Sequence, residues 1–273
     1  MKSRIITGII GIALLLVVLV LPPIAITVAV SLICAMAMYE LLIATHFKMH
    51  RSIFVTSVIF AASVPFFYLF NSYLPILIIL FVYISEMVCI QIITYKTQSI
   101  ECISFAFLMS LIFPVAFSCL AYLRIFSVRH GLFYVIIAII MPWMCDMGAY
   151  FVGTFFGRHK LCPNISPKKT VEGLVGGLII SVLSSVAAGM IYQYYFLKDT
   201  ATVVLWQLAI VAFICALLSV PGDLFASLIK RQNSVKDFGS IMPGHGGILD
   251  RFDSMLLSVP FFYLLVHYLP LIV

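Results

Sequence analysis

Long apolar runs alternate with short polar segments along the whole chain. Nine such runs are present, each bounded by Pro, Gly or a cluster of charges. A helix of about 20 apolar residues spans a bilayer, so each run predicts a transmembrane helix. The runs cover residues 5–21, 24–43, 53–70, 74–94, 102–123, 132–151, 174–195, 203–222 and 253–272. The pattern predicts an all-α, polytopic integral membrane protein with about nine transmembrane helices.

The composition agrees with this interpretation. Of the 273 residues, 64% are hydrophobic and only 10% are charged, whereas soluble domains carry about 25% charged residues. Nine spans and their loops leave no room for a sizeable soluble domain, so residues 1–273 are expected to form a single membrane-embedded unit. The first run resembles a secretory signal, but it lacks a small-x-small cleavage site and meets Pro22-Pro23 and a second run. An uncleaved helical hairpin is therefore predicted.

The basic residues predict the orientation, because Lys and Arg are retained on the cytoplasmic side. With the N-terminus inside, thirteen of the sixteen Lys and Arg residues lie in cytoplasmic segments and three lie outside. The thirteen are Lys2, Arg4, Lys48, Arg51, Lys96, Arg158, Lys160, Lys168, Lys169, Lys230, Arg231, Lys236 and Arg251. We therefore expect a multi-pass protein of the cell (inner or plasma) membrane with a cytoplasmic N-terminus. The basic residues form no stripe interleaved with aromatics, so nucleic acid is not expected as a partner.

Charge is concentrated in residues 222–253, which hold four aspartates and five basic side chains counting His245. If residues 223–231 continue the eighth helix, its 3.6-residue period places Asp223, Ser227 and Lys230 on one face. Carboxylates beside several cations at a membrane surface suit a magnesium-bound polyphosphate. The alternative is a set of self-neutralising ion pairs between helix ends. Ion pairs alone require neither the glycines of this segment nor an aspartate at membrane depth.

The same segment is predicted to fold back on itself. The sequence PGHGG cannot form regular helix, because Pro removes a donor and the glycines permit tight turns. Asp250 and Asp253 share a face at i and i+3 as the ninth helix begins. The turn is predicted to bring Asp223 close to Asp250.

A second polar segment, residues 152–173, places Lys168, Lys169 and Thr170 just before the seventh span. Pro167 at a helix start, with an acid in the first turn, indicates an N-terminus whose dipole can receive phosphate. No G-x-x-x-x-G-K-[ST] motif precedes it, so it is not a P-loop. Taken alone, the segment is as typical of a positive-inside anchor as of a binding element.

Other polar and sulfur-containing residues occur within the spans. Asp146 lies near the cytoplasmic end of the sixth span, where a water-filled pocket can open inward. Glu40 and Glu86 have no polar motif around them, and we interpret them as helix-packing or interface carboxylates. Seven scattered cysteines without a C-x-x-C pair are expected to be small buried hydrophobes.

These motifs carry a resemblance. The stretch SLIKRQNSVKDFGSIMPGHGGILDRFD is similar to the signature of phosphatidate cytidylyltransferases, or CDP-diacylglycerol synthases: S-x-x-K-R, four residues, K-D, then P-x-H-G-G-x-x-D-R-x-D. Upstream, DMGAYFVGTFFGRHKL and SPKKTVEG also resemble elements of that family. The likeness covers residues 143–260, which indicates a catalytic half at 131–273. Residues 1–130, the N-terminal helices, match only as a run of spans.

The resemblance implies a nucleotidyltransferase that makes CDP-diacylglycerol and pyrophosphate from CTP and phosphatidic acid at the membrane, in phospholipid biosynthesis. It implies Mg²⁺ as cofactor, with room for a second cation. We expect Asp223 and Asp250 to be the principal metal ligands, with Asp253 and Asp146 assisting or acting through water. The implied catalytic residues are Asp223, Lys230, Arg231, Asp250 and Arg251. The implied substrate-binding residues are Asp146, Ser166, Lys168, Lys169, Thr170, Ser227, Lys236, Asp237, His245, Gly246 and Gly247. A homodimer is left open.

Three other functions are alternatives. A CTP-dependent polyprenol or dolichol kinase shares the CTP, metal and membrane requirements but transfers the γ-phosphoryl group. A transporter places ionisable groups near the midplane and often contains inverted repeats, whereas the charges here cluster at one face. A CDP-alcohol phosphotransferase needs a D-G-x-x-A-R motif, which is absent from the sequence. His245 is expected to contact phosphate or fix the turn, since the lipid phosphate has little proton to lose to a general base.

Overall fold

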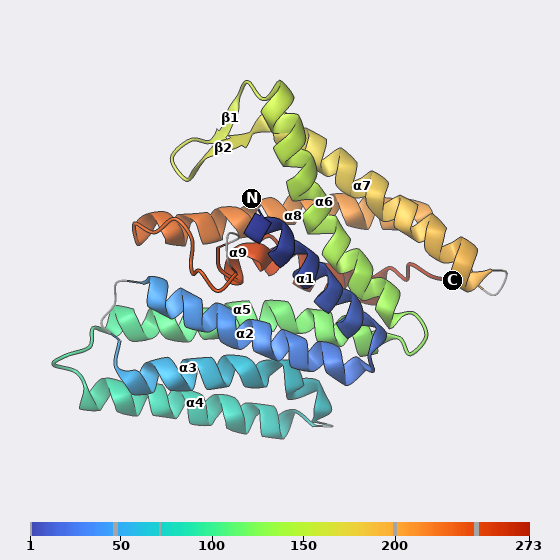
Figure 1. The fold of residues 1–273 in the computed structure, drawn as a ribbon. Helices are drawn as coiled ribbons and strands as arrows, with labels where there is room; N and C mark the ends of the chain where they lie inside the picture. Colours follow the sequence, from blue (N-terminus) through green and yellow to red (C-terminus); the bar gives the residue numbers. More distant parts are fainter. Residues whose placement is uncertain (1, 46–48, 71, 199–200, 243–245) are drawn as a thin grey trace. The chain divides into compact units, whose positions relative to one another are not determined.

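A computed structural model describes residues 2–45, 49–70, 72–198, 201–242 and 246–273, with side chains from residue 7 onward. Helices dominate the described chain, and one short hairpin interrupts them (Figure 1). In chain order the elements are α1 (Lys2–Val20), α2 (Pro23–Ala44), α3 (Arg51–Ser63), η1 (Val64–Leu69), α4 (Tyr73–Ile93), α5 (Ile100–Phe126), α6 (Gly131–Phe156), β1 (Lys160–Cys162), β2 (Ser166–Thr170), α7 (Val171–Tyr192), η2 (Gln193–Leu197), α8 (Leu205–Gln232), α9 (Leu249–Phe252) and α10 (Met255–Tyr268).

Seven helical segments in the described part of the chain are long and apolar enough to cross a membrane. They are Pro23–Ala44, Arg51–Leu69, Tyr73–Ile93, Ile100–Phe126, Gly131–Phe156, Val171–Leu197 and Leu205–Gln232. The apolar part of α1, Thr7–Val20, and α10, Met255–Tyr268, are shorter. With 14 residues, α10 extends about 21 Å, less than the ~30 Å hydrocarbon core. The all-α, polytopic prediction is confirmed, while the count of nine spans and the cytoplasmic N-terminus stay predictions.

The chain divides into two compact units, and the division does not follow chain order. One unit contains residues Met1–Tyr122 and Gln232–Arg251, and the other contains Leu123–Arg231 and Phe252–Val273. We call them the N-terminal unit and the C-terminal unit. The segment 232–251 therefore packs with the N-terminal helices, although the chain enters and leaves it from the other unit. The predicted single membrane unit, with a division near residue 130, stays a prediction.

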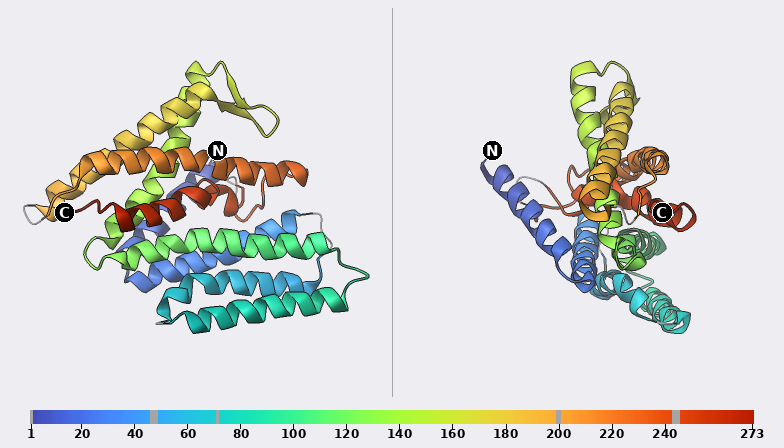
Figure 2. Two further views of the ribbon diagram at one scale, coloured as in Figure 1. Left: turned by 180° about the vertical axis from the view of Figure 1, so that it is seen from behind. Right: turned by 90° about the vertical axis from the view of Figure 1, so that its right-hand side faces the viewer.

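In the N-terminal unit, α2 to α5 run side by side (Figures 1 and 2). Tyr83 of α4 joins three of these helices, because its hydroxyl bonds Ser57 Oγ of α3 at 3.1 Å and Ser110 Oγ of α5 at 2.7 Å. Its ring stacks on Phe60 with the centroids 4.1 Å apart. A hydroxyl surrounded by hydrocarbon needs hydrogen-bonding partners, so these bonds fix the register of α3, α4 and α5.

In the C-terminal unit, α6 and α7 pack closely through glycines (Figure 1). A Cβ on Gly177 would lie 2.5 Å from the Cys145 carbonyl oxygen, and one on Gly148 would lie 3.0 Å from Gly177 Cα. The Ser181 hydroxyl donates to the Met141 carbonyl at 2.8 Å. Small residues that allow backbones to approach are the usual way in which helices associate in lipid. The α6–α7 pair therefore gives a fixed base for the loop at its end.

That loop is a two-stranded antiparallel hairpin, β1–β2, which the apolar pattern did not predict. Its register pairs Lys160 with Thr170 and Cys162 with Ser166. Pro167 lies inside β2, so the prediction that it opens the seventh helix is wrong. The helix begins at Val171, where the Thr170 hydroxyl accepts from Gly173 N at 3.1 Å and acts as the N-cap. A capping hydroxyl satisfies one of the free amides at a helix start, which explains the later beginning.

Helix α8 continues through Gln232, as predicted for residues 223–231. The predicted ninth helix is divided, because Asp253 and Ser254 form a turn between α9 and α10. The predicted fold-back is present: Met242 N donates to the Gly246 carbonyl at 3.1 Å, and Gly246 has φ +86°. That backbone conformation suits glycine and strains other residues. His245 of this turn lies outside the described residues.

The close approach at Gly177 generates a stability prediction. We expect Gly177→Ala to lower the free energy of unfolding by about 1–3 kcal/mol, the usual cost of overpacking, and to lower the midpoint of thermal unfolding in detergent. Gly11→Ala is the matched control, because a Cβ there has no heavy atom within 4 Å among those placed around it. Alanine favours helix over glycine, so the control should unfold no earlier than the wild type. Equal midpoints for both variants would contradict the packing.

Candidate active site

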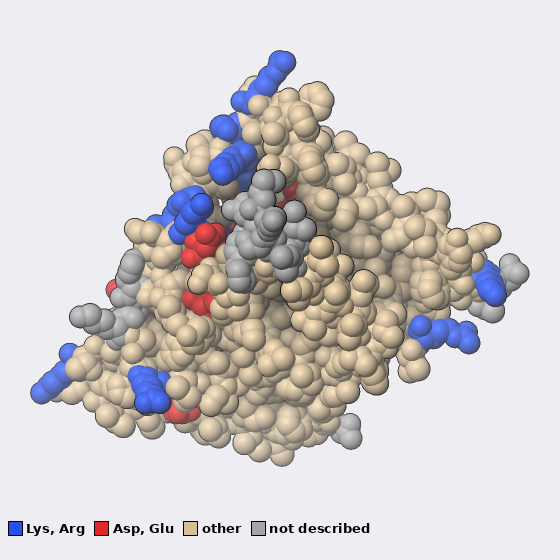
Figure 3. Space-filling model, in the orientation of Figure 1, with Lys and Arg blue, Asp and Glu red and all other residues tan. Residues whose placement is uncertain are grey.

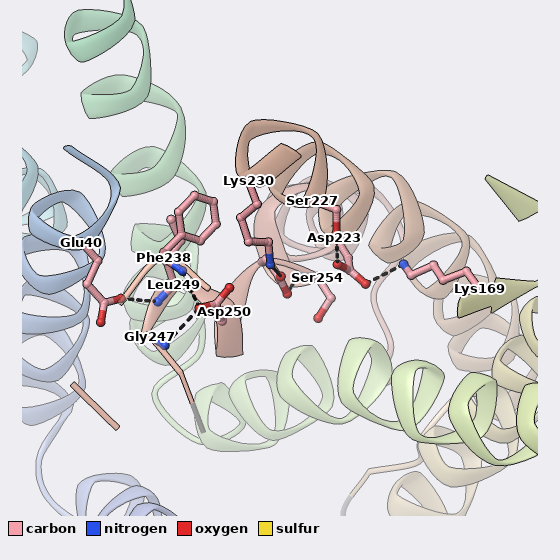
Figure 4. A network of polar contacts seen from close by, with 11 residues as sticks. Glu40, Lys169, Asp223, Ser227, Lys230, Phe238, Gly247, Leu249, Asp250 and Ser254 are labelled. Atoms are coloured by element: carbon pink, nitrogen blue, oxygen red, sulfur yellow. Dashed lines mark hydrogen bonds and ion pairs between the residues drawn. The ribbon is translucent and has the colours of Figure 1, made fainter. Parts of the chain in front are cut away.

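Charged side chains occupy a few small areas of the face drawn in Figure 3, and most of that face is uncharged. Two groups of polar contacts account for most of the residues that the sequence singles out, one in each unit (Figure 4). We call the first the Asp223 cluster, consisting of Asp146, Lys169, Asp223, Ser227 and Ser254. The second is the Asp250 loop, consisting of the described residues 237–242 and 246–250.

The Asp223 cluster joins two helices, the hairpin and the turn before α10 in the C-terminal unit. Lys169 Nζ of β2 lies 2.5 Å from Asp223 Oδ2 of α8, and both side chains are about four-fifths buried. Ser227, one turn further along α8, donates to Asp223 Oδ1 at 3.4 Å. Asp146 of α6 interacts electrostatically with Asp223 and Lys169 and forms a hydrogen bond with the Ser254 side chain. The cluster therefore holds two carboxylates and one ammonium group close together.

A second ion pair lies further along α8. Lys230 Nζ is 3.8 Å from Asp253 Oδ2, and Asp253 is only 8% exposed. Asp253 Oδ1 also accepts from Ser254 N at 2.8 Å, which fixes the carboxylate in the turn between α9 and α10. The turn lies against α8 because Gly222 has no side chain: a Cβ there would be 3.0 Å from the Asp253 carbonyl oxygen. The glycine before Asp223 thus allows α8 and this turn to approach.

The base of the hairpin is held by Glu172 in the first turn of α7. Its carboxylate accepts from Arg158 N at 3.0 Å and from His159 N at 3.2 Å, and Oε1 lies 2.6 Å from His159 Nδ1. At the hairpin turn, Arg231 Nε donates to the Ile165 carbonyl at 3.2 Å. These contacts hold β2, and therefore Lys169, near α8. Thr170 caps this end of α7, and the Glu172 carboxylate beside it fixes the backbone that leads into β1.

Asp250, the last residue of the Asp250 loop, joins the two sides of the loop by hydrogen bonds. Asp250 Oδ2 accepts from Phe238 N at 2.9 Å and from Gly247 N at 3.0 Å, so one carboxylate joins both sides of the loop. A Cβ on Gly246 would lie 3.3 Å from Asp250 Oδ2 and 3.4 Å from the Asp237 carboxyl carbon. Two predicted residues, Asp237 and Asp250, therefore face the same glycine.

Glu40 of α2 also binds this loop. Leu249 N donates to Glu40 Oε2 at 3.1 Å, and Glu40 is only 2% exposed (Figure 4). The sequence alone offers one signal for this residue, a carboxylate within an apolar run, and our interpretation of it as a packing or interface group was incomplete. Ser254 was also missed, although it follows directly after the last aspartate of the signature.

The structure brings together some of the predicted residues. Asp146, Lys169, Asp223 and Ser227 form one cluster, Lys230 pairs with Asp253, and Asp237, Gly246, Gly247 and Asp250 belong to one loop. Lys168, Lys236 and Arg251 are exposed, and Ser166 is half-buried in β2. Asp223 and Asp250 belong to different units, so their predicted approach stays a prediction. His245 lies outside the described residues.

The donor chemistry of these residues fits a magnesium ion that arrives with a phosphate ligand. Mg²⁺ commonly takes one or two protein carboxylates and keeps water and phosphate oxygens in its other positions. Asp223 and Asp146 offer such a pair. Among the described residues, no group of three or more His, Cys, Asp or Glu is arranged to hold a metal ion. A closed cage made only of those described side chains is therefore not present, whereas a site shared with a substrate needs none.

Comparison with known proteins places the chain in a family. The profile of the family described as "Cytidylyltransferase family" matches residues 2–269. The chain is 37% identical over 176 residues to the phosphatidate cytidylyltransferase of Staphylococcus saprophyticus and 38% identical over 176 residues to that of Staphylococcus aureus strain COL. It is 41% identical over 138 residues to the phosphatidate cytidylyltransferase of Bacillus subtilis strain 168.

The shared segments are shorter than either partner. They cover 64% of this chain and 65% of the two staphylococcal proteins, and 50% of this chain and 49% of the Bacillus protein. The family profile, in contrast, extends over almost the entire sequence, including the N-terminal helices that carry Glu40. On this match the chain belongs to the cytidylyltransferase family.

Proposed function

We propose that this protein is a phosphatidate cytidylyltransferase of phospholipid biosynthesis. An oxygen of the phosphatidate phosphate attacks the α-phosphorus of CTP and forms a new P–O bond. The bond between the α-phosphorus and the oxygen bridging to the β-phosphorus breaks, and pyrophosphate leaves with that electron pair. The products are CDP-diacylglycerol and pyrophosphate, so atoms and charge balance without a redox partner. Family membership and the complete signature over residues 227–253 support the proposal.

The main physical obstacle to this reaction is repulsion between two anions, a triphosphate and a lipid phosphate. The observation that carries the proposal is the Asp223 cluster, where the Lys169 ammonium is held 2.5 Å from a carboxylate and largely out of water. An ammonium in such a place interacts strongly with an added phosphate, because the surroundings screen it poorly. Lys230 is held similarly by Asp253. Preorganised cations of this kind lower the barrier without having to reorient during the reaction.

The remaining basic residues are proposed to divide the two substrates between them. They are Lys168, Arg231, Lys236 and Arg251. Arg231 lies at the end of α8, Lys168 in β2, Lys236 in the segment after α8 and Arg251 in α9. Basic residues in such polar segments between apolar helices are suited to anions that approach along a membrane surface. Ser166, Thr170, Ser227, Asp237, His245, Gly246 and Gly247 are proposed to complete the substrate contacts. The glycines allow backbone amides to approach a phosphate closely.

We propose Mg²⁺ as the cofactor, with Asp223, Asp250 and Asp253 as its protein ligands, Asp146 assisting and a second cation accommodated beside it. When bound, the ion would draw charge from the phosphate oxygens and favour departure of pyrophosphate. Without it, Lys169 and Lys230 balance two of these carboxylates. The lysines can then contact phosphate when the carboxylates bind metal, which keeps all the charges paired throughout the cycle.

The proposed setting is the cell membrane, with these residues on the cytoplasmic side, where CTP is available. A homodimer is compatible with the proposal and is not required by it. The distribution of Lys and Arg over the predicted loops supports this orientation.

The orientation can be tested with single cysteines at two exposed positions, Ser240 in the Asp250 loop and Val128 between α5 and α6. The background carries Cys89→Ser and Cys162→Ser, because the other five cysteines are buried. A membrane-impermeant maleimide should label Val128→Cys in intact cells and Ser240→Cys only in inverted vesicles. Labelling of both positions from the same side would contradict the predicted topology.

The activity can be tested with purified protein, phosphatidate, Mg²⁺ and CTP labelled at either the α- or the γ-phosphorus. We expect the α label to enter the lipid and the γ label to leave as pyrophosphate. Transfer of the γ label to a lipid would instead indicate a lipid kinase. Asp223→Asn and Asp250→Asn should each lower turnover by at least about 100-fold, the scale of losing one group that stabilises transition-state charge.

Two controls accompany these variants. Glu101→Gln removes an exposed carboxylate at the start of α5 and should leave turnover unchanged. The double variant of Asp223 and Asp250 should be little worse than either single variant, because residues that serve one ion act as a unit. Near-normal turnover in either single variant, or additive losses in the double variant, would refute the shared metal site.

A further inference from the structure

We propose that Glu40 is a positioning residue, whose buried carboxylate holds the Asp250 loop and thereby aims the Asp250 carboxylate. The inference rests on the proposed function, in which Asp250 is a metal ligand. It assigns a role in the reaction to α2, a helix of the N-terminal unit that lies outside the residues resembling the family signature.

The first observation is that Glu40 is buried almost completely. It is 2% exposed, and its neighbours along α2 are mostly apolar. A buried carboxylate is costly unless hydrogen bonds or opposite charges compensate it, so a residue that only fills space would not need to be acidic. Its compensation comes from the backbone of the Asp250 loop: Leu249 N donates to Oε2 at 3.1 Å.

The second observation is that the loop is shaped around this carboxylate. Gly239 and Gly247, on the two sides of the loop, both face Glu40, and a Cβ on either would be too close to its carboxyl group. For Gly247 the distance to Oε2 would be 2.5 Å. Any larger residue at these positions would displace either the loop or the carboxylate. The glycines therefore allow α2 to reach the loop backbone.

The third observation connects this contact to Asp250. The amide bound by Glu40 belongs to Leu249, the residue directly before Asp250. Asp250 in turn accepts hydrogen bonds from Phe238 N and Gly247 N. Phe238 directly precedes Gly239, and Gly247 itself faces Glu40. The two carboxylates also repel each other, since Asp250 interacts electrostatically with Glu40. The loop backbone thus separates and orients both of them (Figure 4).

A displacement of about 1 Å in a reacting group can cost about 100-fold in rate. Loss of the Glu40 contact frees the backbone at Leu249, so it should move Asp250 without removing any group that touches a substrate. The expected signature is a loosened loop and impaired use of Mg²⁺ in a protein that is otherwise folded. A purely structural role would instead lower the stability of the entire fold.

The variants can separate hydrogen bonding from charge. Glu40→Gln keeps an acceptor oxygen at the same reach, so the bond from Leu249 N can still form while the negative charge is removed. Glu40→Asp keeps the charge but is shorter by one methylene and loses the reach. A positioning role therefore predicts that Gln retains more activity than Asp. A metal-binding or purely electrostatic role predicts the reverse order.

We would measure hydrogen–deuterium exchange and Mg²⁺-dependent turnover on the full-length protein in detergent. In Glu40→Asp and Glu40→Ala, amides within 238–242 and 246–249 should exchange about tenfold faster or more, since opening of the loop becomes easier. The rest of the protein should exchange as in the wild type. Turnover should fall about 100-fold, and half-maximal activity should require more Mg²⁺. Glu40→Gln should lie within a few-fold of the wild type.

Glu86→Gln and Glu86→Ala are the matched controls. Glu86 is a half-buried carboxylate in α4, within the same unit, and its electrostatic partner is Tyr83. Both controls should match the wild type in loop exchange and in Mg²⁺ dependence. Unchanged loop exchange in Glu40→Asp, or higher activity in Asp than in Gln, would overturn the proposal. A wild type that forms no CDP-lipid would refute the proposed activity instead, and the exchange measurement would still decide whether Glu40 holds the loop.

Discussion

A charge buried among apolar helices has to be compensated, and this constraint organises both groups of polar residues. Asp223 is matched by Lys169, Asp253 is matched by Lys230, and Glu40 is matched by backbone amides. Because an uncompensated buried charge costs several kcal/mol, each partner fixes the position of the other. Under the proposed function, the same pairing keeps the groups that would meet a phosphate or a cation already oriented and partly removed from water.

Much of the fold can be predicted from the sequence, because a hydrocarbon solvent permits few choices. An α-helix forms hydrogen bonds between its own backbone N–H and C=O groups, for which lipid provides no partners. Long apolar runs therefore predict helices whatever their exact sequence. Most of each of the nine predicted runs is helical in the structure, although a turn at Asp253 and Ser254 opens the ninth. Residues 223–231 continue α8, as the 3.6-residue period indicates. The contacts of Asp223 with Ser227 follow from that period as well, since residues four apart share a face.

Contacts between distant segments could not be predicted in this way. Nothing in the polar stretch before α7 distinguishes a hairpin from a loop, and the capping by Thr170 that delays the helix depends on local geometry. In the sequence, Glu40 is a single acid within an apolar helix, and its hydrogen-bond partner, Leu249, is 209 residues further along the chain. Periodicity carries information about faces of one element, whereas such a pairing depends on how elements pack. Without that packing, the two glycines that face Glu40 resemble ordinary turn residues.

The division into units limits how the chain can be cut into fragments that fold. Residues 232–251 pack with the first 122 residues, yet they are connected on both sides to the other unit. Cutting the chain near residue 130 would leave the second fragment with this segment but without the helices that surround it. A fragment or chimera that keeps every signature residue would still lack the N-terminal helices against which this loop packs. The signature therefore identifies the family but does not contain all the residues that the loop needs in order to fold.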